Sequence, residues 1–126
     1  MTSASMPDAF DTILPSSITA AALRNGNEWV LPFPRAKEAI QLASEHLIAV
    51  LGVEVFHIEE NGLRVENYTG YAFDFLGDWP AYVQQNNRAA FQFIEKNELG
   101  DGYGYILTTS SEGEFKNLDR QVRVRT

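Results

Sequence analysis

Residues 34–66 constrain the fold of this chain more than any other stretch, because three local signals in them agree. Pro34 suits the first turn of a helix, Gly52 suits its end, and Asn61-Gly62 suits the two-residue loop of a β-hairpin. Apolar side chains from Pro34 to Leu51 recur at helical spacing, which indicates an amphipathic helix. The stretch therefore predicts a helix followed by two antiparallel strands.

The rest of the chain extends this unit into a predicted α+β domain. The predicted elements are helices over 18–23, 34–51 and 78–97 and strands over 53–59, 63–68 and 103–109. The order helix, helix, strand, strand, helix, strand favours a small antiparallel sheet of three or four strands packed against two or three helices. Residues 27–34 are excluded from a central strand, because prolines occupy positions 32 and 34.

The length of 126 residues indicates a single domain over residues 1–126. Residues 1–14 lack helical periodicity and are expected to form a loose lead-in. Residues 115–126 are expected to form an edge strand or a basic tail. No cationic stretch followed by an apolar one opens the chain, and no apolar run approaches the roughly 18 residues of a membrane span. We therefore expect a cytoplasmic protein without a membrane partner.

The charge is strongly acidic and unevenly distributed. The net charge is −7. Residues 1–114 hold 16 acidic and 6 basic side chains, a net charge of −10, and residues 115–126 carry +3. An acidic body repels phosphate, so nucleic acid is not expected as a partner. The charge either attracts a basic partner or only keeps the protein soluble, and charge alone leaves both interpretations open.

No pattern of residues points to catalysis, a cofactor or a metal. The chain has no cysteine, which excludes thiol chemistry and thiolate metal sites. His46 and His57 have no second ligand at metal spacing. The glycine-rich residues 100–104 follow a predicted helix and precede a predicted strand, the reverse of a phosphate-binding loop. We therefore expect a protein that is not an enzyme and has no catalytic, cofactor-binding or metal-binding residues.

Aromatic and acidic side chains gather in and after the predicted hairpin. Tyrosine and tryptophan supply large contact areas with few rotatable bonds, and neighbouring carboxylates favour an arginine or lysine partner. The alternative is that the aromatic side chains fill the core where the chain crosses the edge of the sheet. The candidate partner-binding residues are Glu54, Glu59, Glu66, Tyr68, Tyr71, Asp74, Asp78 and Trp79.

A series of short motifs in residues 18–109 resembles the bacterial polymorphic-toxin immunity proteins, in particular the immunity protein 40 family. The motifs are Trp29-Val30-Leu31-Pro32, Leu51-Gly52-Val53-Glu54-Val55-Phe56, Trp79-Pro80-Ala81-Tyr82-Val83 and Tyr105-Ile106-Leu107. The resemblance implies an α+β fold and a non-catalytic cytoplasmic protein that binds and neutralises a cognate toxin domain. It implies no active residues.

Two other classes of function stay open at this point. One is a small-molecule-binding or enzymatic α+β domain with an aromatic pocket lined by Trp29, Tyr68 and Trp79. The other is a self-associating module in which the aromatic group forms a homodimer interface.

Overall fold

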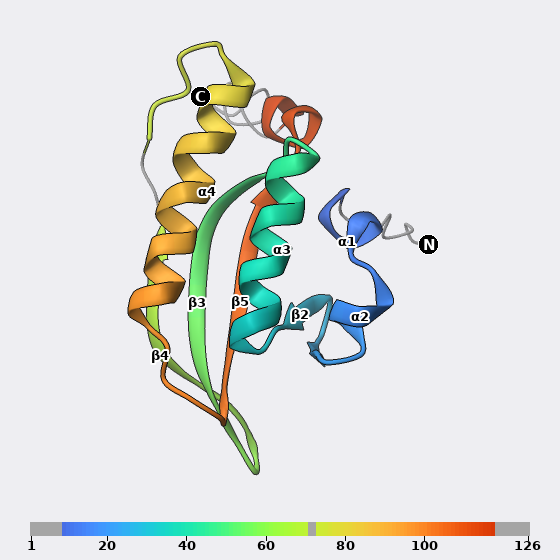
Figure 1. The fold of residues 1–126 in the computed structure, drawn as a ribbon, viewed down its shortest axis with the longest axis vertical. Helices are drawn as coiled ribbons and strands as arrows, with labels where there is room; N and C mark the ends of the chain where they lie inside the picture. The colour runs from blue at the N-terminus through green and yellow to red at the C-terminus, as the bar shows by residue number, and fades with distance from the viewer. Residues whose placement is uncertain (1–8, 71–72, 118–126) are drawn as a thin grey trace.

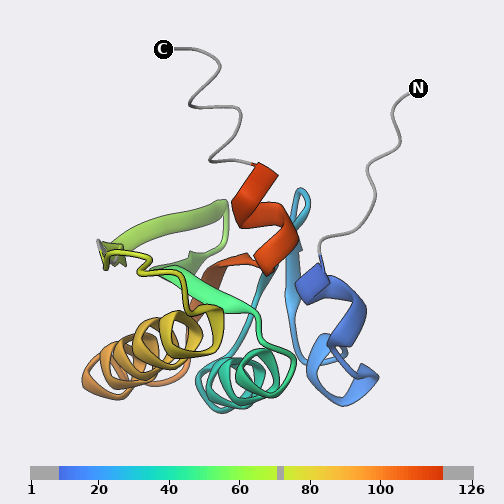
Figure 2. The same cartoon turned by 90° about the horizontal axis from the view of Figure 1, so that it is seen from above.

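The computed structural model describes residues 9–70 and 73–117 and has the predicted α+β fold. Its main sheet is antiparallel, with the strand order β4-β3-β5. The two long helices, α3 and α4, lie side by side on one face of this sheet (Figures 1 and 2). These elements are α3 (Phe33–Glu45), β3 (Ala49–Glu59), β4 (Gly62–Gly70), α4 (Trp79–Lys96) and β5 (Tyr103–Ser110).

The N-terminal part forms more structure than the sequence predicted. Its elements are α1 (Ala9–Ile13), α2 (Ser16–Thr19), β1 (Leu23–Asn25) and β2 (Glu28–Val30). The prediction of a loose lead-in is wrong from Ala9 onward, because Phe10 is buried in the core and holds α1 in place. The predicted helix over 18–23 ends at Thr19, and β1 pairs with β2 in a separate small sheet. Leu31 then bridges to Tyr105 through two backbone hydrogen bonds of 2.8 Å, which places this hairpin beside β5.

The helix predicted to reach Leu51 ends six residues earlier, at Glu45. Leu47 adopts a left-handed φ of 55° after the helix. The Ile48 amide donates to the Ala43 carbonyl at 2.8 Å, and the Leu47 amide donates to the Ser44 carbonyl at 3.2 Å. These two bonds form a Schellman ending, with leucine in the position that glycine usually occupies. Gly52, expected to end the helix, lies inside β3 instead.

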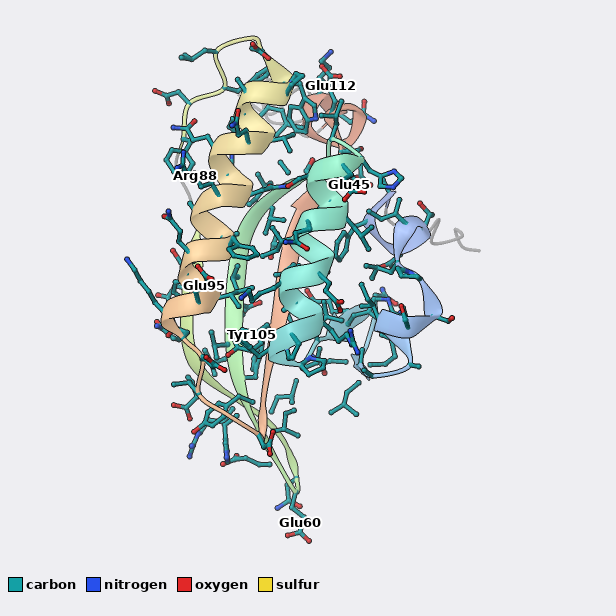
Figure 3. The ribbon with its side chains drawn as sticks, viewed as in Figure 1. Glu45, Glu60, Arg88, Glu95, Tyr105 and Glu112 are labelled. Carbon is teal, nitrogen blue, oxygen red and sulfur yellow. The ribbon has the colours of Figure 1, made fainter. Side chains whose placement is uncertain are left out.

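The predicted hairpin is present, and its details differ by one residue. Glu59 pairs with Gly62, so the two-residue loop is Glu60-Asn61. Gly62 is the first residue of β4 and has a φ of 141°. Further along, the register changes between Val55 and Phe56, which leaves Glu66 as an extra residue in β4. The hairpin extends beyond the ends of both helices, with Glu60 at its tip (Figure 3).

The last two predicted elements are confirmed almost residue for residue. Asp78 begins α4 as its N-cap, and its Oδ1 atom accepts from the Ala81 amide at 3.1 Å. β5 is one residue longer than predicted. Residues 112–117 form a short helix, which includes the start of the predicted edge strand or tail, and residues 118–126 lie outside the described part. Among the described residues, no helix is long and apolar enough to cross a membrane.

The main core lies between the helices and the sheet. The sheet contributes Val53, Val55 and Tyr105, each at most 1% exposed, and α3 and α4 contribute Ile40 and Ile94. These apolar side chains stabilise the packing of both helices on what we call the helix-covered face.

Candidate functional site

The second face of the main sheet carries neither long helix (Figure 2). Successive side chains in a strand point to opposite faces, so the residues that alternate with Val53 and Val55 lie on this side. Among the described residues, the short helix at 112–117 lies over it close to the start of β3 (Figure 2), and the β1–β2 hairpin packs against it through Val30. We call this surface the open face; it comprises Glu54, Phe56, Ile58, Leu63, Val65, Tyr68 and Ile106.

The floor of the open face is apolar and closely packed. Phe56 and Ile106 are 8% and 1% exposed, and Val30 from β2 packs against both. Ile58 and Leu63, which are cross-strand neighbours, border this cluster. The small N-terminal hairpin therefore shields one side of the open face and leaves the side formed by β4 uncovered.

Glu54 and Tyr68 are direct cross-strand neighbours on the uncovered side. Opposite residues in an antiparallel pair have Cβ atoms about 5 Å apart. Tyr68 is 72% exposed and Val65 is 51% exposed. Glu54 is half-buried, and its carboxylate has no hydrogen bond or ion pair within residues 9–70 and 73–117. The site thus combines exposed apolar area with a carboxylate that contacts no cation in the described part of the chain.

β4 is also the edge strand of the main sheet, since its only sheet neighbour among the described strands is β3. An edge strand has backbone N–H and C=O groups that point away from the sheet and are available to a further strand. β4 spans Gly62–Gly70 and is exposed along most of its length. The open face therefore continues into an edge that a partner's strand can extend.

The hairpin tip carries two of the predicted carboxylates, and both already contact a cation of the same chain. Arg64 contacts Glu66 at 2.8 Å and Glu59 at 3.3 Å, and His57 Nδ1 lies 3.3 Å from Glu59. The hydrogen bond that Arg64 donates to Glu66, together with the charge of Glu59, raises the pKa of Arg64 above its ordinary value. Glu59 and Glu66 are thus partly neutralised, unlike Glu54.

The residues predicted just before α4 contribute to the helix and the core. Asp78 caps α4, as described above. Trp79 is 3% exposed, and its Nε1 atom donates to the Leu47 carbonyl at 2.6 Å. It packs with Phe75, Tyr82 and Phe115, so core filling is its role in this structure. Asp74 is exposed in the connecting segment, and Tyr71 lies outside the described residues.

The structure does not gather the three aromatic side chains of the predicted pocket. Trp29 packs against the main core with the Arg24 guanidinium 4.1 Å above its ring, whereas Trp79 belongs to a separate cluster. Tyr68 is on the open face, apart from both. Among the described residues, no group of three or more histidine, aspartate or glutamate side chains is arranged to hold a metal ion.

Of the eight predicted partner-binding residues, Glu54 and Tyr68 come together on the open face. Sequence reasoning missed Val65 and the apolar floor of Phe56 and Ile106. The position of Val65 on this face could have been predicted from the sequence. Pairing the two hairpin strands residue by residue from the loop places Val65 opposite Phe56. Nothing local indicated that Val30 covers the floor.

Comparison with known proteins identified no relative of this chain. No protein-family model matches the chain, and searches of the curated proteins and of the solved structures gave no significant match.

Proposed function

We propose that this protein is a non-catalytic binding protein of the immunity type, which neutralises a cognate bacterial toxin domain by docking its open face onto it. The observation that carries the proposal is the pair Glu54 and Tyr68. A half-buried carboxylate that contacts no cation within residues 9–70 and 73–117 lies beside an aromatic side chain that is 72% exposed. The sequence resemblance to immunity proteins points to the same function.

The chemistry of the pair defines the partner surface. Burying Glu54 under a partner without a counter-charge would be costly, so the partner has to place an arginine or lysine there. Tyr68 and Val65 supply the apolar contact area next to that ion pair. A toxin whose active cleft binds phosphate offers such basic side chains, and the net charge of −7 speeds association with a basic protein.

The first test is rescue from toxicity. The gene product encoded beside this protein is expressed in a susceptible cell, with and without this protein. We expect growth to be restored only when both are present, and the two proteins to copurify. Full toxicity in the presence of folded protein would contradict the proposed function.

The second test maps the surface with three variants, of which Glu54→Lys and Glu45→Lys make the same change of charge. Glu54→Lys and Tyr68→Ala alter the open face, whereas Glu45→Lys alters an exposed carboxylate on α3 (Figure 3). We expect the two open-face variants to weaken binding of the toxin by at least about tenfold, as central interface residues do. Glu45→Lys should change the dissociation constant by less than about threefold, because rim or remote charges contribute little. Equal effects of all three changes would place the contact elsewhere.

A further inference from the structure

A groove of about 750 Å³ runs between α3 and α4 on the outer side of the helix layer, away from the open face. Its floor includes Ile40 and Val83, which are buried, and the half-buried Phe91. Leu47 lines one end and is 47% exposed. The groove thus exposes apolar area in a helix layer whose rim is otherwise polar.

One wall of the groove is a ridge of α4 that consists of Gln84, Arg88, Phe91, Gln92 and Glu95. Spacings of three and four residues place these side chains along one side of a helix. Figure 3 shows Arg88 and Glu95 on α4, the first nearer its start and the second nearer its end. The ridge therefore carries a cation and an anion on one exposed side of the same helix.

Arg88 has no ion pair within the described part of the chain. Glu95 contacts Lys37 at 3.4 Å, in an exposed pair of the kind that contributes little. Arg88 and Glu95 are seven residues apart, which corresponds to about 10.5 Å along a helix, too far for a direct contact within one chain. Arg88 is thus available to a second molecule, and Glu95 can exchange its exposed contact with Lys37 for a contact with that molecule.

The ridge is complementary to itself when it is reversed. Consider a twofold axis that crosses α4 between Phe91 and Gln92. It pairs each residue of one copy with the residue of the second copy that lies equally far along the sequence on the other side of the axis. Arg88 then faces Glu95 of a second copy, and Glu95 faces Arg88 of that copy. Phe91 and Gln92 meet at the axis, where two half-buried aromatic rings approach each other. Each ridge would lie over the groove of the other copy.

We propose that the occupant of this groove is a second copy of this chain, which forms a twofold-symmetric homodimer through antiparallel α4 helices with two reciprocal Arg88–Glu95 ion pairs. This interface is separate from the aromatic group around Trp79, whose side chains pack against one another within one chain. It is also on the opposite side of the sheet from the open face. Dimer formation and toxin binding therefore depend on different residues and are tested independently.

The test uses sedimentation equilibrium of the full chain and three variants over a range of concentrations. We expect the wild-type protein to dimerise, and to dimerise less as salt is added, because salt screens exposed charges. Arg88→Glu and Glu95→Arg each create two like-charge contacts per dimer and should raise the dimer dissociation constant at least about tenfold. Lys96→Glu, a matched charge reversal of an exposed side chain off the ridge, should change it by less than about threefold.

Mixing the two charge-reversal variants gives the sharpest outcome. Arg88→Glu leaves acids at both positions and Glu95→Arg leaves bases at both, so a mixed dimer has two attractive pairs whereas each variant alone has two repulsive ones. We expect the equimolar mixture to form heterodimers within about threefold of the wild-type affinity. Circular dichroism of each variant checks that the fold is intact. A monomeric wild type at every concentration, or a mixture that stays monomeric, would overturn the second copy as the occupant and leave the groove to a different protein.

Discussion

The polar side chains on the two sides of the main sheet differ in whether they have hydrogen-bond partners within the chain. On the helix-covered face, Asn87 is 3% exposed, and its amide accepts from the Val50 amide at 2.7 Å and donates to the Ile48 carbonyl at 3.0 Å and to Ser44 Oγ at 2.9 Å. On the open face, the half-buried Glu54 carboxylate has no such contact within the described residues. Asn87 therefore serves the fold, whereas the Glu54 carboxylate stabilises no contact within the described part of the chain.

The largest expected effect comes from Asn87, because its amide joins α4 to α3 and to the start of β3. Asn87→Leu keeps the volume but removes the side-chain partner of the buried Val50 amide and Ile48 carbonyl, whereas Ser44 Oγ keeps its bond to the Ile40 carbonyl. We expect it to lower the free energy of unfolding by about 3 kcal/mol or more, measured by urea denaturation.

The adjacent Asn86 is the control for this effect. It is completely buried, donates only to the Tyr82 carbonyl at 2.8 Å, and has an Oδ1 atom without a partner in the described structure. Asn86→Leu removes that unsatisfied atom, so we expect a change within about 1 kcal/mol. Equal losses of unfolding free energy from the two substitutions would mean that side-chain volume, and not hydrogen bonding, determines the stability at these two positions.

The next effect concerns the close approach of β3 and β4. A Cβ atom added at Gly52 would lie 2.8 Å from the Thr69 carbonyl oxygen, whereas one added at its cross-strand neighbour Gly70 would contact nothing within 4 Å. We expect Gly52→Ala to cost about 2 kcal/mol in unfolding free energy because the strands must separate. Gly70→Ala should change it by less than about 0.5 kcal/mol. Thermal unfolding of both variants measures the difference, and indistinguishable melting temperatures would contradict it.

A smaller effect depends on pH and belongs to the helix-covered face. Tyr105 is 1% exposed, and its hydroxyl donates to the Asn97 carbonyl. Burial raises the pKa of the Tyr105 phenol above its ordinary value, and the Glu98 charge adds to this, against an opposing hydrogen bond with the Leu99 backbone. Because the folded state then holds its proton more tightly than the unfolded state, the stability contribution is complete below about pH 10 and falls as the pH rises through the folded-state pKa.

Tyr105→Phe isolates this contribution. We expect it to cost about 1 kcal/mol at neutral pH through the lost hydrogen bond, and to flatten the alkaline part of the stability profile. Urea denaturation of both proteins at a series of pH values measures the two curves. Parallel curves above pH 10 would show that other groups account for the alkaline loss.

The smallest effect on stability is expected on the open face. Tyr68→Ala removes a side chain that is 72% exposed, so we expect the free energy of unfolding to change by less than about 0.5 kcal/mol. The same substitution should weaken toxin binding by at least about tenfold, as proposed above. A large loss of unfolding free energy would contradict this difference between the two faces, because Tyr68 would then stabilise the fold.

Much of the fold was predictable because its signals are local. Asp78 predicts the start of α4 through its capping side chain, and alternation across the hairpin loop places Val65 opposite Phe56. Alternation alone would pair Glu54 with Asn67, and the extra residue Glu66 in β4 moves the pairing to Tyr68. The prediction was less successful where a contact between distant segments determines where an element ends. The helix before β3 ends early because of the turn at Leu47, whose carbonyl accepts the hydrogen bond of Trp79 from a segment 32 residues away.

By itself, the sequence determined the α+β class, the main strands, the capped helix and the sharing of a strand face between Glu54 and Phe56. Only the tertiary structure decided which face the helices cover, that Trp79 is buried, and that Arg64 partly neutralises Glu59 and Glu66. The physical reason is that periodicity and capping depend on neighbours within a few residues. Burial and ion pairing depend on which distant segments pack together, and similar alternating patterns occur on both sides of β3.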